Sequence, residues 1–202
     1  MKLVKRIIAR LRRDRAAMIV KIEKKRLINT DFTILSQNCI GGVFYHDMGL
    51  RFTSPTINLF FTCPDFIKFV RNLEWYLNQE LQMTWGEKYP IGYLDDIAIC
   101  FQHFDSCDEA KEKWEERKKR INRDKILILC TDMEEFSDEI YEQWKHVPFP
   151  KVLFSAKKRN SPDVIFFPEY AKNGKVGDLI PDRKFYKDGV LIKAVNSMSE
   201  RI

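Results

Sequence analysis

The hydrophobic and polar residues after Asn29 follow a pattern that predicts strands and helices in alternation. Short apolar runs have strand character, and between them apolar residues recur at helical spacing. The runs that predict strands are 32–35, 56–61, 97–104, 126–130, 152–155 and 164–167. The run at 126–130 is continuously apolar, which suits a strand covered on both sides. We therefore expect an α/β fold: a single three-layer domain with a largely parallel or mixed sheet and helices on both faces.

Local signals predict where the helices begin. A proline followed by an aspartate suits the first turn of a helix at 64–77. The capping-box spacing of a serine and a glutamate opens a charged helix at 106–121, and a threonine and a glutamate with the same spacing predict a helix at 131–144. The stretch from Ala171 is expected to be loop-like, because glycines and a proline interrupt it.

The first 28 residues predict a basic amphipathic helix, an arm beside the domain at 29–202. Residues 1–26 hold eleven Lys or Arg against two acidic residues, a formal charge of +9. The remaining 24 basic and 27 acidic residues give −3. Apolar residues recur at helical spacing along the arm. They are Leu3, Val4, Ile7, Ile8, Leu11, Met18, Ile19 and Ile22.

This division of charge limits the partners. A body with slight negative charge has no field to attract a polyanion, so no nucleic acid is expected and any phosphate-rich partner must meet the arm. The arm either lies on anionic lipid or packs on its own domain or on a second subunit. Both alternatives stay open. The expected location is the cytoplasm, with a peripheral position on the inner face of the membrane if the arm binds lipid.

Cysteine usage agrees with that location. The chain has five cysteines, an odd number, and no CxxC pair, which is typical of reduced thiols. Charged residues interrupt every apolar stretch near the N-terminus, and no apolar run approaches the length of a membrane span. We therefore expect neither a signal peptide nor a transmembrane helix.

The first candidate site is the polar, glycine-rich segment 36–42, directly after a predicted strand. In α/β sheets ligands bind at the carboxyl ends of the strands. Ser36, Asn38, Gly41 and Gly42 could cradle a phosphate or a sugar hydroxyl, since glycines let backbone N–H groups approach a ligand. The alternative is a tight turn. The segment is neither a Walker loop nor a GxGxxG fingerprint.

Three further residues could act as catalysts. Cys39 becomes a nucleophile only with a nearby base, for which His46 and His103 are candidates; a structural thiol is the alternative. Asp96 or His103 could deprotonate a hydroxyl. Asp95 and Asp96 are adjacent and point apart in an extended chain, which is poor geometry for a metal site. No metal ligands are assigned, although the need for a divalent ion stays open.

The predicted helix at 106–121 carries Trp114, Arg117 and Arg120. Arg117 falls beside Trp114 on the expected buried stripe, where a guanidinium needs an anion or a carbonyl as partner. A bound diphosphate is one such partner, and Asp96 or another internal carboxylate is the other. Together with Arg120 these residues form a second candidate ligand-binding set.

Several motifs together resemble the bacterial domain-of-unknown-function family numbered 1919. The likeness covers about residues 30–160 and excludes the arm. The family often reads Ser-Asn-Asn-Cys where this chain has Ser36-Gln37-Asn38-Cys39. Gln37 thus replaces the first asparagine and keeps its amide group on a longer side chain. The segments that carry the resemblance are 34–42, 54–61, 89–92, Asp96, His103 and the series Ala110, Trp114, Arg117, Arg120, Ile121 and Asn122.

Members of that family are commonly described as exopolysaccharide-biosynthesis proteins, which implies a pathway and no particular reaction. We therefore expect a transferase in surface-polysaccharide assembly, a glycosyltransferase that uses a nucleotide sugar or another glycan intermediate. The alternative is a non-catalytic binding or accessory protein of the same pathway. A third option is a hydrolase or acyltransferase that depends on Cys39.

Overall fold

A four-stranded parallel sheet lies at the centre of the computed structural model, which describes residues 2–199. Its strands are β1 (Thr33–Ser36), β5 (Ile126–Thr131), β6 (Lys151–Ser155) and β7 (Val164–Phe166), in the order β1-β5-β6-β7. All three neighbouring pairs are parallel. The expected α/β fold is therefore confirmed.

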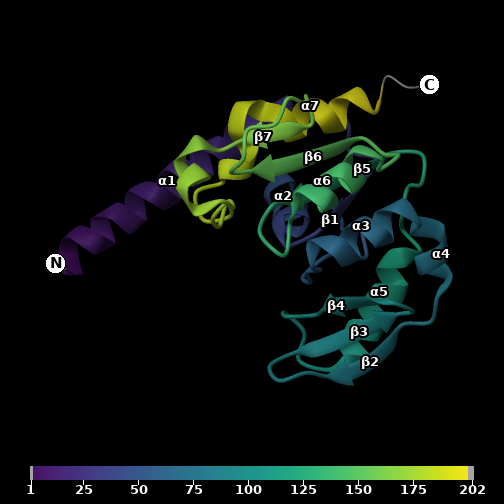
Figure 1. Cartoon of the computed structure of the whole chain (residues 1–202). Helices are drawn as coiled ribbons and strands as arrows, with labels where there is room; N and C mark the ends of the chain where they lie inside the picture. The colour runs from purple at the N-terminus through teal and green to yellow at the C-terminus, as the bar shows by residue number, and fades with distance from the viewer. Residues whose placement is uncertain (1, 200–202) are drawn as a thin grey trace.

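Helices cover both faces of this sheet (Figure 1). Alternate residues of a strand point to opposite faces, so Ile128 and Cys130 pack into one apolar cluster and Leu127 and Leu129 into another. The first cluster includes side chains of α3 (Cys63–Arg71), α4 (Leu73–Asn78), α5 (Cys107–Lys118) and α6 (Asp138–Lys145). The second includes side chains of α2 (Ile40–Met48) and α7 (Val190–Ser197).

A small antiparallel sheet extends the first face. It consists of β2 (Gln82–Trp85), β3 (Pro90–Leu94) and β4 (Ile97–Cys100), in that order. Phe60 forms an isolated antiparallel bridge with Cys100, which connects this sheet to the loop at 56–61. The strand predicted at 97–104 corresponds to β4 but ends at Cys100, and β2 and β3 were not predicted. β2 is largely exposed and carries little apolar pattern.

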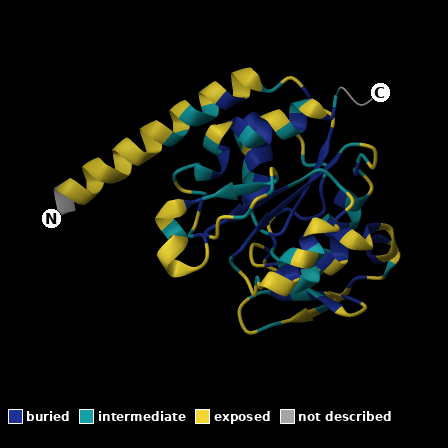
Figure 2. Cartoon of the chain, turned by 45° about the horizontal axis from the view of Figure 1, so that its top comes forward, coloured by how far each residue is buried: buried dark blue, intermediate teal, exposed yellow. Residues whose placement is uncertain are grey.

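The expected N-terminal helix is present as α1 (Lys2–Arg26). Residues 4–15 are exposed and project from the body, whereas the half-buried and buried positions of α1 begin at Ala16 (Figures 1 and 2). Asn196 of α7 fixes the end of the helix, since its Oδ1 accepts the backbone N–H groups of Ile28 and Asn29 at 2.9 and 3.2 Å. No described helix is both long enough and apolar enough to cross a bilayer.

The serine cap of α5 is confirmed, whereas the helix predicted from Thr131 is wrong. Ser106 Oγ accepts the N–H of Glu109 at 3.1 Å. Thr131 instead ends β5, and its hydroxyl donates to Gln37 Oε1 at 2.9 Å. The helix begins later, after Ser137, whose hydroxyl accepts the N–H of Ile140 at 3.2 Å. The local capping pattern at Thr131 is therefore not used, because a long-range hydrogen bond to Gln37 holds this residue at the end of β5.

Three other local predictions need correction. The apolar run at 56–61 is buried loop, with Phe60 alone in a bridge, because helices and the small sheet cover it from outside. The helix predicted at 64–77 breaks at Asn72, with φ −125° and ψ 42°, into α3 and α4. The loop predicted from Ala171 contains α7, whose apolar residues pack on the sheet.

Candidate functional site

A pocket of about 360 Å³ opens at the carboxyl ends of β1 and β5. We call it the carboxyl-edge pocket. It lies directly beyond the first strand, as the position of ligand sites in α/β sheets predicts. Its lining residues come from the segments after β1 and β5, two loops and the C-terminal region. They are Gln37, Asn38, Cys39, Phe60, Gln102, Met133, Glu134, Asp178 and Ile180.

A network of amide and hydroxyl groups holds the inner wall in place. Gln37 is buried; its Nε2 donates to the carbonyl of Phe61 at 2.6 Å, and its Oε1 accepts from Asn38 Nδ2 at 3.2 Å. Asn38 Nδ2 also lies 3.2 Å from Thr131 Oγ1, and its Oδ1 accepts the N–H of Ile40 at 3.1 Å. Because each group has a fixed partner, Asn38 is preorganised at the pocket wall.

Cys39 lies in the same wall, at the N-cap position of α2. Burial raises the pKa of its thiol, and the negative charge of Asp178 raises it further. Gln102 Nε2 donates to Cys39 Sγ at 3.3 Å. Among the described residues no histidine is hydrogen-bonded to this sulfur. The thiol is therefore protonated at neutral pH, which does not suit a nucleophile.

The outer wall is acidic. Glu134 and Asp178 are exposed and line the pocket from two separate segments, the one after β5 and the C-terminal region. Asp178 Oδ1 accepts the N–H of Ile180 at 2.9 Å, which orients its carboxylate. No lysine or arginine belongs to the described lining. The pocket thus offers amide donors and carboxylate acceptors, a set that matches a ligand with several hydroxyl groups better than a phosphate.

The predicted residues Ser36, Gly41 and Gly42 lie behind this wall and do not line the pocket. Ser36 Oγ accepts the N–H of Gly41 at 3.2 Å, and Ser36 N–H donates to Thr56 Oγ1 at 2.9 Å. A Cβ atom on Gly41 would lie only 2.8 Å from that of Ser36. The glycine at 41 therefore allows α2 to pack closely on β1.

The α5 residues turn inward, away from the pocket. Trp114 is in the core. Arg117 Nη1 donates to the carbonyl of Ile57 at 3.1 Å, and its guanidinium lies 5.5 and 5.8 Å from the ring centroids of Phe52 and Phe104. Burial lowers its pKa. The partner of Arg117 is thus a carbonyl and two aromatic rings, and the expected pairing with Asp96 is wrong.

Arg120, Asp96 and His103 also lie outside the pocket lining. Arg120 donates to the carbonyl of Phe52 at 3.4 Å and pairs with Glu116. Asp96 accepts from Lys68 Nζ at 2.9 Å and from the Tyr76 hydroxyl at 2.7 Å, and these two hydrogen bonds lower its pKa. His103 is exposed, next to the lining residue Gln102.

Of the ten predicted site residues, the structure brings Asn38 and Cys39 together in this pocket. The described residues contain no group of three or more His, Cys, Asp or Glu suited to a metal ion. The sequence reasoning missed Phe60, Gln102, Glu134 and Asp178. Glu134 could have been found, because it closely follows the strand predicted at 126–130. Nothing in the local sequence marks Asp178.

Comparison with known proteins supports the family assignment. The model of a family described as a domain of unknown function (DUF1919) matches residues 10–199. An uncharacterized protein of Haemophilus influenzae is 32% identical over 181 residues, which cover 86% of this chain and 88% of that protein. The likeness identified at about residues 30–160 is thereby confirmed and extends into the arm. The chain belongs to the DUF1919 family.

Proposed function

We propose that this protein binds a saccharide in the carboxyl-edge pocket and transfers a glycosyl group from a nucleotide sugar in bacterial surface-glycan assembly. One observation carries the proposal. The pocket combines amides, two carboxylates and an aromatic ring, Phe60, and its described lining has no cation. Amides and carboxylates pair with sugar hydroxyls, and an aromatic side chain packs against the apolar face of a sugar ring.

The two carboxylates have the chemistry required of a general base. In the transfer, the acceptor oxygen bonds to the anomeric carbon while the bond from that carbon to the diphosphate breaks. A carboxylate at hydrogen-bond distance would accept the proton that the acceptor hydroxyl loses. Asp178 is our candidate for this role, because its carboxylate is oriented by the N–H of Ile180. Asn38 and Gln102 would orient the sugar.

A thermal-shift screen with nucleotide sugars, nucleoside diphosphates and free monosaccharides tests this proposal. A ligand at a hundredfold excess over its dissociation constant stabilises the native state by about 2.7 kcal/mol. Asn38→Ala should remove the shift, and Asp178→Asn should abolish turnover of the donor while the shift remains. Glu112→Gln changes an exposed carboxylate of α5 outside the pocket and is the matched control.

A non-catalytic glycan-binding protein is the second candidate. The absence of a cation from the described lining favours it, because a bound diphosphate needs compensating charge. It predicts that free saccharides bind as well as nucleotide sugars, with no donor consumed. Absence of any shift from saccharide or nucleotide sugar contradicts both candidates. We do not propose a Cys39-dependent reaction, since the raised pKa keeps the thiol protonated and no described histidine is hydrogen-bonded to the sulfur.

A further inference from the structure

The first half of α1 has little tertiary support: the exposed pair of Arg12 with Asp182 is its ion pair to the body among the described residues. Residues 4–15 are all exposed (Figure 2). A helix of this length is about 18 Å long. Isolated helices of this length are marginal in water. A helix of this kind is typically stabilised by a surface on which it lies.

One side of α1 presents an exposed row of apolar side chains, which we call the apolar stripe. Apart from the neighbours Ile7 and Ile8, its members follow one another at steps of three, four or seven residues, and so they share one side of the helix. A different set of residues, including Ala16, Ile19 and Glu23, faces the body. The members of the apolar stripe are Val4, Ile7, Ile8, Leu11, Met18 and Ile22, each about half exposed or more.

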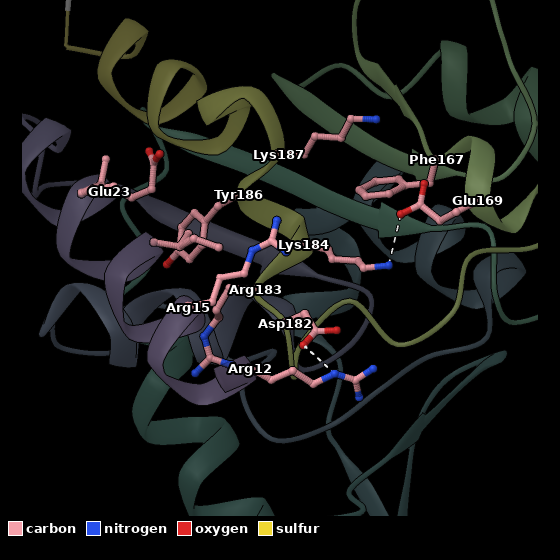
Figure 3. A pocket seen from close by; sticks show the side chains of 12 residues that line it. Arg12, Arg15, Glu23, Phe167, Glu169, Asp182, Arg183, Lys184, Tyr186 and Lys187 are labelled. Atoms are coloured by element: carbon pink, nitrogen blue, oxygen red, sulfur yellow. Dashed lines mark hydrogen bonds and ion pairs between the residues drawn. The ribbon is translucent and has the colours of Figure 1, made fainter. Parts of the chain in front are cut away.

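A cleft of about 570 Å³ lies between α1 and the segment 167–187, and we call it the arm cleft (Figure 3). It meets the apolar stripe at Ile22, which belongs to both. Arg15 lines the cleft and continues the spacing of the stripe, midway between Leu11 and Met18. Five cations and three acidic residues line the cleft. They are Arg12, Arg15, Arg183, Lys184, Lys187, Glu23, Glu169 and Asp182.

Not all of these cations are available to a ligand. Lys184 pairs with Glu169 at 3.1 Å, and Arg183 forms two hydrogen bonds with the carboxylate of Asp47. Arg12 lies 3.9 Å from Asp182 in a partly exposed pair, which is a weak attachment. Arg15 forms no ion pair with any described residue. Arg12 and Arg15 can therefore bind an anion in the cleft.

The cleft also holds a buried acceptor. One carboxylate oxygen of Glu23 accepts from Arg26 at 3.0 Å, and the other is buried without a hydrogen-bond partner among the described residues. An unpaired acceptor in this position requires a donor. A phosphate ester that also carries a hydroxyl group would satisfy both the cations and Glu23.

We propose that α1 lies in the plane of an anionic phospholipid bilayer, with the apolar stripe in the headgroup region and a lipid phosphate in the arm cleft. Residues 4–15 carry six cations and one acidic residue, so a second copy of the helix would be repelled. Anionic lipid matches this charge and also takes up apolar side chains. The carboxyl-edge pocket has no residue of α1 in its described lining, so it stays accessible to soluble ligands.

Co-sedimentation of the full chain with vesicles tests this proposal. Vesicles of phosphatidylcholine alone are compared with vesicles in which part of it is replaced by phosphatidylglycerol. We expect binding to the second kind only. Ile7→Gln, Ile8→Gln and Leu11→Gln combined should weaken binding more than tenfold, while Ile28→Gln, an exposed residue outside the stripe, should have no effect. Circular dichroism establishes that each variant is folded.

A second pair of variants tests the cleft. Arg12→Gln with Arg15→Gln should weaken binding to anionic vesicles at least tenfold, since each cation near the membrane contributes about fivefold. Arg51→Gln with Arg71→Gln removes the same charge from exposed positions on the body and should change binding less than twofold. Equal losses in the two double variants would mean that net charge alone acts, and the cleft proposal would be wrong.

Other occupants give different results. Light scattering could show that the unmodified chain is a dimer and that the triple glutamine variant is a monomer. That result would assign the stripe to a second copy of the chain and overturn the proposal. Soluble glycerol phosphate could stabilise the chain only when Arg12 and Arg15 are present, while no vesicle binding occurs. That result would assign the cleft to a free phosphate ester and overturn the lipid assignment. Loss of saccharide binding in pocket variants, with vesicle binding unchanged, leaves this proposal supported.

Discussion

The carboxyl-edge pocket and the arm cleft are two hollows in one chain with opposite chemistry. The pocket has about 360 Å³, amides and carboxylates, and no cation in its described lining; the cleft has about 570 Å³ and five cations. Strand ends and interlocked amides build the first, whereas a projecting helix and a loop-rich segment build the second. The charge imbalance of this sequence therefore places cations at the hollow beside the arm and leaves the described lining of the other hollow without them.

One short segment connects the two hollows. Asp178 and Ile180 line the pocket, and Asp182, Arg183 and Lys184 line the cleft. A ligand in the pocket and a lipid phosphate in the cleft would therefore lie on either side of the same few residues. This arrangement suits a reaction in which a soluble glycosyl donor meets an acceptor at a membrane surface.

The largest expected effect concerns the anchor of the cleft. Asp47 is buried, with a side chain 5% exposed, and Arg183 meets it at 2.7 and 3.0 Å. Arg183→Ala removes both charged hydrogen bonds and leaves that carboxylate with the Tyr186 hydroxyl as its remaining donor. It should lower the free energy of unfolding by about 3–5 kcal/mol in urea denaturation. Arg123→Ala, which breaks an exposed pair with Glu74, should cost less than about 1 kcal/mol. A similar small loss for Arg183→Ala would refute the anchoring role.

The second largest loss of stability is expected from changes in the amide network of the pocket. Gln37→Ala removes the side-chain donor to the carbonyl of Phe61 and the acceptor for the hydroxyl proton of Thr131, so we expect a loss of about 1–3 kcal/mol in stability. Arg15→Gln in the exposed wall of the cleft should change stability by less than about 0.5 kcal/mol. Thermal denaturation of the two variants compares the hydrogen-bonded wall of the pocket with the exposed wall of the cleft. Equal losses of stability would contradict this difference between the two walls.

Ionic strength should separate the two hollows in binding measurements. Raising the salt from about 0.1 M to about 1 M shortens the Debye length from about 10 Å to about 3 Å. Vesicle binding through the arm should then fall at least tenfold, while saccharide affinity in the pocket should change less than twofold. Calorimetric titrations at both salt concentrations measure the second quantity. A saccharide affinity that falls together with vesicle binding would place both ligands in the cationic cleft.

Thiol reactivity reports the electrostatics of each hollow. Burial raises the pKa of the Cys39 thiol. The thiolate is the species that is alkylated, so the alkylation rate should be low at pH 7 and rise about tenfold per pH unit below that pKa. Ile22→Cys places a thiol at the edge of the cationic cleft, where nearby cations lower a thiol pKa. Peptide mass spectrometry after iodoacetamide should show faster labelling at position 22; faster labelling of Cys39 would contradict this assignment.

The smallest effect is expected for two residues that lie outside both hollows. Asp96 is held by Lys68 and Tyr76, and His103 is exposed beside the pocket. Asp96→Asn and His103→Ala should each change saccharide affinity and donor turnover less than twofold. A large loss of turnover with unchanged affinity in either variant would return the role of base to that residue and remove it from Asp178.

Local patterns in the sequence were sufficient to predict much of the fold. The apolar run at 126–130 is the buried strand β5, and the capping serine at position 106 opens α5, because both signals depend on neighbours in the chain. The basic amphipathic arm could also be predicted, since helical spacing and charge are properties of one continuous segment. The position of Asn38 after a strand correctly indicated the edge where the pocket opens.

Tertiary structure alone decided which side chains meet. Gln102 and Asp178 reach Asn38 only because the chain folds back over many residues, and no local pattern encodes such a contact. Packing likewise turned Arg117 towards the carbonyl of Ile57, and a hydrogen bond to Gln37 kept Thr131 in a strand. The sequence by itself determined the division of charge and the elements with strong local signals, such as β5, α5 and α1, because periodicity and composition act locally. The structure decided which residues line each candidate site, because burial and partner choice depend on residues far apart in the chain.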